Sequence, residues 1–206
     1  ALETLKQIYK PLRDRGIPIL ETDLITSELI KYASNSFLTC KIAFINEMAD
    51  LCEIIGANIN QVSTGIGLDK RIGSDFLKAG PGFGGSCFPK DILALQYLTT
   101  QVKSDFLVLD AVIKANEKRV RLIVEKIKKF LGGNVQEKKI TVLGLTYKAG
   151  TDDLRSSPAI ELINLLWENG AEVKAYDPQG MPNAYKYFGN KLVCGTSAVE
   201  AAHGAD

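Results

Sequence analysis

The chain has 206 residues, of which 46% are hydrophobic, and 25 basic residues against 24 acidic ones leave a net charge of +1. This is the composition of a globular protein with a buried core, and it provides no overall field to attract nucleic acid or an anionic membrane. No apolar run reaches the about 20 residues of a membrane-spanning helix, so we expect a cytoplasmic protein. Four cysteines without paired spacing and a single histidine predict free thiols and no metal site.

The first part of the chain predicts helices. From Asp23, a plausible helix cap, apolar residues recur at spacings of three and four up to Ile55, and Gly56 is a natural stop. About 30 residues would make a helix of roughly 45 Å, longer than a small domain is wide, so we expect it to reach beyond its own subunit. Shorter and longer helical patterns follow over residues 60–65 and 105–131.

A loop rich in glycine and proline, residues 79–91, separates these helical patterns and leads into a helix. Its glycines permit positive φ and a close approach of backbone amides to a ligand. Cys87 lies just before the helix start, where the helix dipole and unpaired N–H groups favour a thiolate. Cys87 is therefore a candidate nucleophile, with Lys90 and Asp91 in reach of the same helical turn. The alternative is a cysteine packed in a structural loop.

Lys31 and Asn35 lie four residues apart in the first long helical pattern, so their side chains share one face of that helix. Together they are candidate hydrogen-bond donors to a developing oxyanion. The alternative is that both are solvated surface residues, since most lysines are exposed. Spacing alone does not separate the two readings.

The last part of the chain changes class. Residues 138–147 and 171–176 read as buried parallel strands, residues 157–169 as the helix between them, and residues 192–194 as a third strand. We therefore expect an all-helical central dimerisation domain over residues 23–133, followed by a partial Rossmann-like parallel α/β domain over residues 134–206. Three strands with few covering helices seldom complete a doubly wound domain, so the sheet looks truncated.

Four segments resemble one family. Residues 82–91, Gly-Phe-Gly-Gly-Ser-Cys-Phe-Pro-Lys-Asp, are similar to the active-site signature of the UDP-glucose/GDP-mannose dehydrogenase family. Residues 69–78 resemble its substrate loop, residues 28–37 its central helix and residues 142–158 the opening of its C-terminal domain. The resemblance runs over residues 20–178 in the family's order.

Family members begin with a dinucleotide-binding domain, and no GxGxxG follows any predicted strand here. The resemblance therefore implies a fragment that is inactive alone, with residues 1–22 as the connector from that domain. Gly144 and Asp177 have a superficial likeness to a dinucleotide site, but the first glycine pair is absent. We assign this half-domain to the nucleotide of a sugar substrate.

The resemblance also implies a reaction. The family oxidises the C6 alcohol of a nucleotide sugar to a carboxylate in two hydride transfers to NAD, without releasing the aldehyde. By resemblance, Cys87 attacks the aldehyde to give a thiohemiacetal, whose oxidation gives a thioester that water hydrolyses. Lys31 and Asn35 match the pair that stabilises oxyanions, and Asp91 matches the carboxylate that orients or deprotonates water.

Further positions match binding residues of the family. Arg71 matches a residue that reaches the substrate of the neighbouring subunit, which implies a homodimer, and we expect it to form through the long helix. Cys87, Lys90 and Arg155 match positions that contact NAD. The remaining matches contact the nucleotide sugar, and they are Phe76, Leu77, Lys78, Gly80, Phe83, Gly84, Tyr147 and Lys148.

The substrate loop favours UDP-glucose. A GDP-mannose or UDP-N-acetylhexosamine dehydrogenase stays open as an alternative, because Cys87, Lys31 and Asn35 would serve each of these sugars. A non-catalytic dimerisation module, in which the cysteine is incidental, is the alternative from another class.

Overall fold

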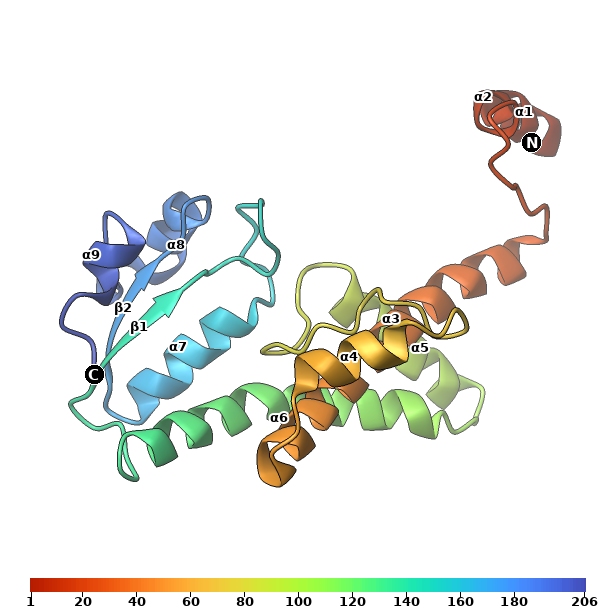
Figure 1. Cartoon of the computed structure of the whole chain (residues 1–206). Helices are drawn as coiled ribbons and strands as arrows, with labels where there is room; N and C mark the ends of the chain where they lie inside the picture. The colour runs from red at the N-terminus through yellow and green to blue at the C-terminus, as the bar shows by residue number, and fades with distance from the viewer.

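Helix α3 (Leu24–Ile55) is the longest element of the structure, a computed structural model that describes residues 1–206. The Asp23 carboxylate accepts a hydrogen bond from the backbone N–H of Thr26, and Gly56 ends the helix with φ +78°. Both predicted ends are confirmed, because each depends on a local signal. Its 32 residues span about 48 Å. Its first turns extend beyond the body of the molecule (Figure 1).

Two short helices precede α3. They are α1 (Leu2–Ile8) and α2 (Lys10–Arg13), and neither has a buried residue. Figure 1 shows them away from the remaining helices, joined to α3 by an extended segment. Neither helix therefore adds to the core of the chain.

The helical part is completed by α4 (Ile59–Gly67), α5 (Phe88–Gln101) and α6 (Leu107–Phe130). Helices α5 and α6 both pack on α3 and on each other. They bury one apolar cluster, which comprises Ala43, Phe83, Ile92, Leu95, Leu109, Val112 and Ile113. Since Phe83 belongs to the glycine-rich loop, this core also anchors that loop.

The α/β part holds three parallel strands in the order β1-β2-β3, which are β1 (Lys139–Leu143), β2 (Glu172–Tyr176) and β3 (Val193–Cys194). Helix α7 (Pro158–Glu168) packs on one face of β2 and α9 (Ala198–Ala202) on the other (Figure 1). Helix α8 (Met181–Phe188) and a 3-10 turn, Gly189–Lys191, connect β2 to β3. The predicted fold class, helical and then parallel α/β, is confirmed.

Strand β1 is shorter than predicted. The expectation over residues 138–147 is wrong past Leu143, because Gly144 follows with φ +93° and turns the chain away from the sheet. The next two backbone N–H groups, of Leu145 and Thr146, donate to the Asp177 carboxylate instead of a neighbouring strand. The second half of the apolar run is therefore a loop.

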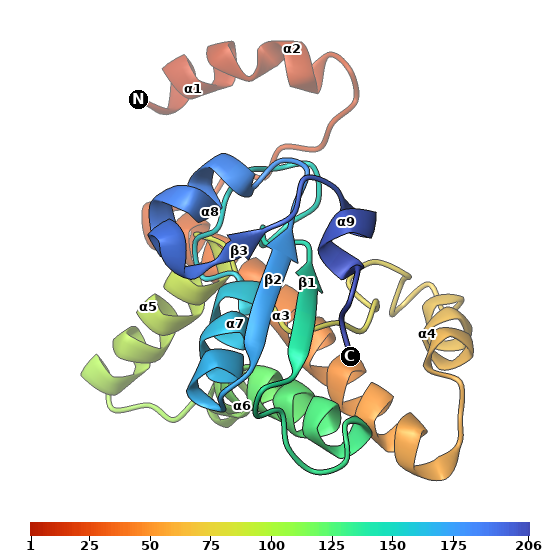
Figure 2. The same ribbon diagram turned by 90° about the vertical axis from the view of Figure 1, so that its left-hand side faces the viewer.

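Helix α6 joins the two parts. It packs along α7, which lies between α6 and the strands in Figure 2. Its last turn also contributes Ile127 to the core of the α/β part, whose buried members include Val142, Ile163, Leu166 and Val173. No helix is both long enough and apolar enough to cross a membrane.

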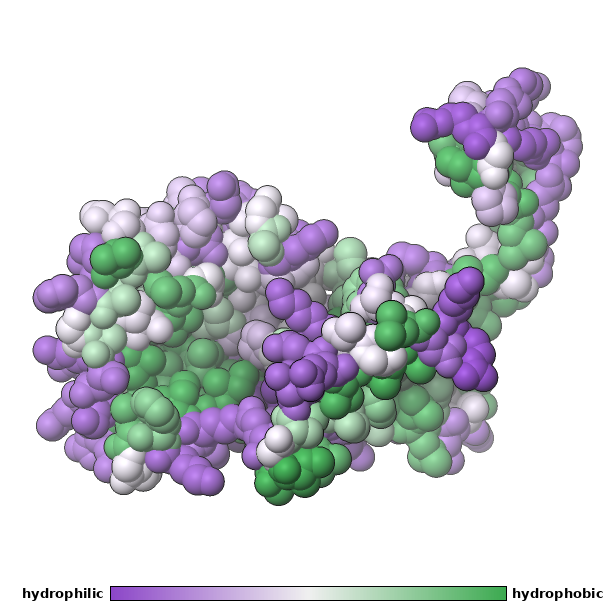
Figure 3. Space-filling model, viewed as in Figure 1, coloured by the Kyte–Doolittle hydropathy of each residue, from purple (hydrophilic) through white to green (hydrophobic).

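An apolar groove lies where the helical part meets the α/β part. It lies between the last turns of α6 and the outer edge of β1, and its apolar lining includes Ile123, Ile127, Phe130, Ile140 and Leu143. In Figure 3, hydrophobic side chains gather on this face of the molecule.

Candidate active site

A charged cluster forms where α3 meets the first turn of α5. The Asp91 carboxylate, 2% exposed, accepts hydrogen bonds from Lys31 Nζ at 2.7 Å, from Asn35 Nδ2 and from Lys90 Nζ. Lys31 and Asn35 donate to the same carboxylate oxygen, Oδ2. The i, i+4 spacing on α3 thus directs two donors at one acceptor, and the prediction that they share a face is confirmed.

The cluster keeps Asp91 ionised. Burial by itself would raise the pKa of this carboxyl group, but the hydrogen bonds from Lys31, Lys90 and Asn35 outweigh it and lower the pKa from 3.8 to about 2. Asp91 in turn raises the pKa of Lys90, mainly through the hydrogen bond between the two side chains. At neutral pH the cluster therefore contains one buried anion and two cations with exposed side chains.

Cys87 lies one helical turn before Asp91, and its carbonyl accepts the Asp91 backbone N–H at 2.9 Å. It is the N-cap residue of α5, and its side chain makes no capping hydrogen bond. All four cysteines are free, as predicted, and Cys87 alone is exposed. Its Sγ lies 3.8 Å from Ser86 Oγ. The thiol is therefore accessible to a ligand and lies on the same helical turn as the charged cluster.

The loop that carries Cys87 contacts the α/β part through glycines. The Gly85 N–H donates to the Arg155 carbonyl at 3.0 Å, and a Cβ at Gly85 would come within 2.6 Å of the Tyr147 ring. A Cβ at Gly84 would come within 1.9 Å of the Ser156 carbonyl oxygen. A side chain at Gly84 would collide with the Ser156 backbone and one at Gly85 with the Tyr147 ring, which explains the two consecutive glycines.

The expected substrate loop runs beside the same helix start. Phe76 adopts φ +64°, and its ring centroid lies 6.2 Å from that of Phe88, the first residue of α5. Leu77 is 2% exposed, and its carbonyl accepts a hydrogen bond from Ser63 Oγ. Lys78 is exposed. Phe83 is buried and meets the Phe88 ring edge-on. This loop and the cysteine loop thus both pack on Phe88.

Three other predicted binding residues are exposed and lie outside the charged cluster. Arg71 pairs with Asp69, and Arg155 pairs with Asp153, each through its Nε and Nη2 atoms. Each arginine pKa is raised by the neighbouring carboxylate. Lys148 is exposed on the loop after β1, beyond Tyr147. Arg155 and Tyr147 therefore meet Gly85 of the cysteine loop, whereas the side chain of Arg71 hydrogen-bonds to Asp69 instead.

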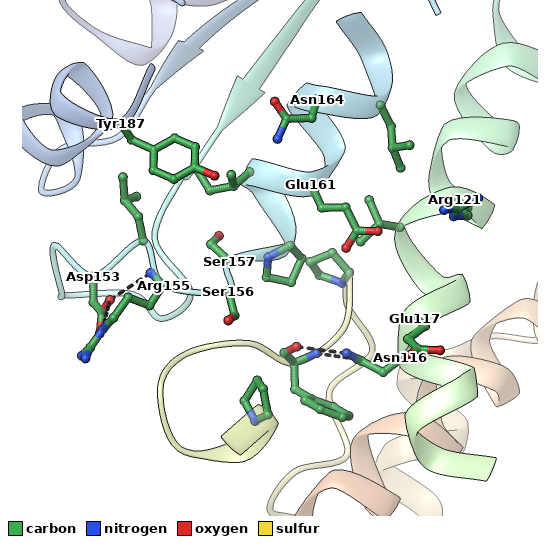
Figure 4. A pocket seen from close by; sticks show the side chains of 18 of the residues that line it. Asn116, Glu117, Arg121, Asp153, Arg155, Ser156, Ser157, Glu161, Asn164 and Tyr187 are labelled. Atoms are coloured by element: carbon green, nitrogen blue, oxygen red, sulfur yellow. Dashed lines mark hydrogen bonds and ion pairs between the residues drawn. The ribbon is translucent and has the colours of Figure 1, made fainter. Parts of the chain in front are cut away.

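A cavity of about 1560 Å³ lies on another side of the cysteine loop, between α6, α7 and the loop after β1. Figure 4 shows Glu117 and Arg121 entering it from α6, and Glu161 and Asn164 from α7. Arg155 lines it, whereas Cys87, Lys31, Asn35 and Asp91 do not. This cavity is therefore adjacent to the charged cluster, not part of it.

Asp177 has a role that the sequence did not reveal. Its carboxylate is buried and accepts backbone N–H groups from four residues: Leu145, Thr146, Gln179 and Gly180. Burial would raise its pKa, but these hydrogen bonds lower it overall. The carboxylate holds the loop after β1 and is not free to bind a ribose.

Polar side chains from α3 and α6 also hold the cysteine loop, a role that their sequence pattern did not predict. They are Asn46, Asn116 and Arg119. The available signal was a pair of polar residues, Asn116 and Arg119, within an otherwise apolar face of α6.

Both parts of the chain are similar to known proteins. Residues 25–118 match the family described as "UDP-glucose/GDP-mannose dehydrogenase family, central domain", and residues 141–206 match "UDP-glucose/GDP-mannose dehydrogenase family, UDP binding domain". The charged cluster and the cysteine lie within the first match, and the Asp177 loop within the second.

Three relatives extend the comparison. The UDP-glucose 6-dehydrogenase of Rickettsia typhi is 58% identical over 203 residues, which cover 98% of this chain and 47% of that protein. A UDP-glucose dehydrogenase structure from the archaeon Pyrobaculum islandicum has TM-score 0.91 at 34% identity, covering 99% of this chain and 46% of the other. A UDP-D-ManNAc dehydrogenase structure from Pyrococcus horikoshii has TM-score 0.72 at 29% identity, covering 90% and 41%. The chain spans about half the length of each of these relatives.

Proposed function

Because the chain belongs to the UDP-glucose/GDP-mannose dehydrogenase family, we propose that it supplies the catalytic cysteine and the UDP-sugar site of an NAD-dependent UDP-glucose 6-dehydrogenase. The observation that carries this proposal is the convergence of Lys31 and Asn35 on Asp91, one turn after the exposed Cys87. A module that served only for dimerisation would have no need to hold these four side chains close together.

In the proposed reaction, the C6 alcohol loses its proton to solvent water, and the Lys31 ammonium group stabilises the resulting alkoxide, which then loses a hydride to become an aldehyde. The Cys87 thiolate then adds to the aldehyde carbon, forming a C–S bond and a thiohemiacetal oxyanion. Lys31 and Asn35 N–H groups donate to that oxyanion. Loss of the second hydride leaves a thioester. Water adds to it and the C–S bond breaks, which releases the carboxylate and the Cys87 thiolate and gives two protons to solvent.

Asp91 has an orienting role in this proposal. Its two oxygens accept three hydrogen bonds, and its pKa of about 2 makes it a weak base at neutral pH. It therefore fixes the Lys31 ammonium and the Asn35 amide in place. The alternative role, deprotonation of the attacking water, is less consistent with so low a pKa.

The residues proposed to contact NAD are accessible to it. The Cys87 side chain is exposed, and the side chains of Lys90 and Arg155 are each 69% exposed, so a nicotinamide and an anionic pyrophosphate can reach them. NAD, when bound, accepts each hydride. Asp177 is occupied by backbone N–H groups, which supports assigning the α/β part to the nucleotide of the sugar.

The test uses an enzyme of the relatives' full length that contains these 206 residues, called the full-length enzyme below. With UDP-glucose it should form two NADH per sugar and UDP-glucuronate. Cys87→Ala should lower this rate by at least about a thousandfold, the equivalent of about 4 kcal/mol, and still bind UDP-glucose. A Cys87→Ala rate near the parent's would show that the cysteine is structural.

The sugar is decided by the same assay. UDP-glucose should give a higher kcat/KM than UDP-N-acetylmannosamine or GDP-mannose, since relatives at 58% and 56% identity are named UDP-glucose 6-dehydrogenases. A preference for either other sugar would move the enzyme to another branch of the family while leaving the thiol mechanism intact.

A further inference from the structure

We propose that Asn46, Asn116 and Arg119 form a clamp on the main chain of residues 80–83 and that this clamp sets the affinity of the site for the nucleotide sugar. The inference rests on the proposed function for its substrate. It assigns a role to three side chains that take no part in the chemistry described above.

The clamp holds the loop at two points. At the first, Asn46 Oδ1 accepts the Gly80 N–H at 2.8 Å, and Arg119 Nε donates to the Gly80 carbonyl at 3.0 Å. At the second, the Asn116 amide accepts the Phe83 N–H at 2.9 Å and donates to the Phe83 carbonyl at 3.2 Å. Side chains from α3 and α6 thus satisfy four backbone groups that have no sheet or helix to pair with.

The clamp is itself fixed. Arg119 is 7% exposed, and its Nη1 donates to the Asn46 carbonyl and to Asp50 Oδ2 at 2.6 Å. Arginine is rarely buried unless it is paired, so this position is determined by its partners. The loop also fits the clamp, because a Cβ at Gly82 would lie 2.7 Å from Asn116 Oδ1.

The loop needs such support because it is rich in glycine. Gly80, Gly82, Gly84 and Gly85 lose more backbone entropy on ordering than other residues would. The clamp reaches the site through Phe83, whose main chain it holds and whose ring packs edge-on against Phe88 at the start of α5. An ordered loop binds substrate without first being ordered by it, which favours tighter binding.

None of the clamp side chains hydrogen-bonds to Asp91, so they are positioning residues. In the full-length enzyme, Asn116→Ala should raise the KM for UDP-glucose by at least about tenfold and change kcat by less than about threefold, because the Lys31, Asn35 and Asp91 cluster stays intact. Arg119→Lys should also raise the KM. The single ammonium group of lysine cannot reach all three acceptors of the guanidinium, which are the Gly80 carbonyl, the Asn46 carbonyl and the Asp50 carboxylate.

Lys126→Met is the matched control. Lys126 also pairs with Asp50, at 2.6 Å, but it lies two turns further along α6 than Arg119, and its ion pairs are with Asp50 and Glu53 and not with the loop. It should leave KM unchanged. An equal rise in KM for Lys126→Met, or a fall in kcat without a change in KM for Asn116→Ala, would overturn the affinity role.

Hydrogen exchange in the 206-residue chain tests the clamp without any substrate. The Phe83 amide should exchange at least about tenfold faster in Asn116→Ala than in the parent or in Lys126→Met. Unchanged exchange would show that the clamp does not hold the loop. If the parent full-length enzyme oxidises no nucleotide sugar, the proposed function and the affinity role fall together, and exchange still decides whether the clamp exists.

Discussion

The ammonium nitrogen of Lys31 lies 2.7 Å from Oδ2 of Asp91, although the two residues are 60 positions apart in the chain. Lys31 is exposed along most of its side chain, whereas Asp91 is buried. The cation is thus open to a ligand on one side and fixed by a buried anion on the other. Loss of the buried anion should therefore change the free energy of unfolding, and loss of a donor to the ligand should change the reaction rate.

Asp91→Asn should destabilise the chain at neutral pH. The folded-state pKa of Asp91, about 2, lies below the ordinary 3.8, so its contribution is complete above about pH 4 and is lost as the pH falls towards 2. The difference corresponds to about 2 kcal/mol at 1.36 kcal/mol per pKa unit. Urea unfolding of parent and variant should show a gap of this size at pH 7 that closes near pH 2. A gap that is independent of pH would mean that the ionised carboxylate is not what stabilises the fold.

Asn35→Ala should slow the full-length enzyme by about a hundredfold to a thousandfold in kcat, as expected for loss of one oxyanion donor. The KM for UDP-glucose should change little, since the donor acts on charge that develops in the reaction. Steady-state rates with UDP-glucose measure both. Ser34→Ala on the same helix is the control, because its hydroxyl donates only to the Ile30 carbonyl. A rise in KM with an unchanged kcat would instead assign Asn35 to substrate binding.

Cys87 should react with a mild alkylating agent at neutral pH at least about tenfold faster than the other three thiols of the 206-residue chain. Burial raises the pKa of Cys40 and of Cys194, and Cys52 is 3% exposed, so all three should react slowly. Peptide mass spectrometry after short exposures would rank the four sites. Similar rates at all four would favour the reading in which the cysteine is incidental.

A two-fold dimer should form through α3. Four apolar residues at spacings of seven, Ile30, Phe37, Phe44 and Leu51, are 43–67% exposed along this helix and mark one continuous stripe. Phe44→Glu should therefore give a monomer in sedimentation at micromolar concentration. A charge at the neighbouring Ala43, which lies in the core of the helical part, would report on folding instead.

Val199→Glu provides the comparison for the dimer. Val199 is 83% exposed on α9, at the opposite end of the molecule from the first turns of α3 (Figure 1). This variant should sediment as the parent does. If the parent itself is a monomer, or if both variants dissociate equally, α3 is not the specific contact.

Features set by neighbouring residues could be predicted from the sequence. The two ends of α3 follow from Asp23 and Gly56, and the shared face of Lys31 and Asn35 follows from helical spacing alone. The prediction of catalytic roles came from family resemblance, since spacing did not distinguish an active-site lysine from a surface one.

Features set by distant residues could not be predicted. Strand β1 ends early because Asp177, 32 residues away from Leu145, takes the backbone N–H that would have continued the sheet. The helix α8 was missed for a different reason. Its eight residues, with Pro182 in the first turn, lack a long apolar repeat and have no side-chain cap. The third donor to Asp91, Lys90, was placed nearby, but its partner depends on how α5 packs on α3.

The contact between Gly84 and the Ser156 carbonyl bears on the exchange of parts between members of this family. A Cβ at Gly84 would lie 1.9 Å from that oxygen, so the two segments pack too closely for any side chain at this position. A chimera that takes its α/β part from a relative with another sugar preference would bring a different surface against the loop that carries Cys87. Such a chimera should retain activity only when residues 82–87 and 147–156 are transplanted from the same parent.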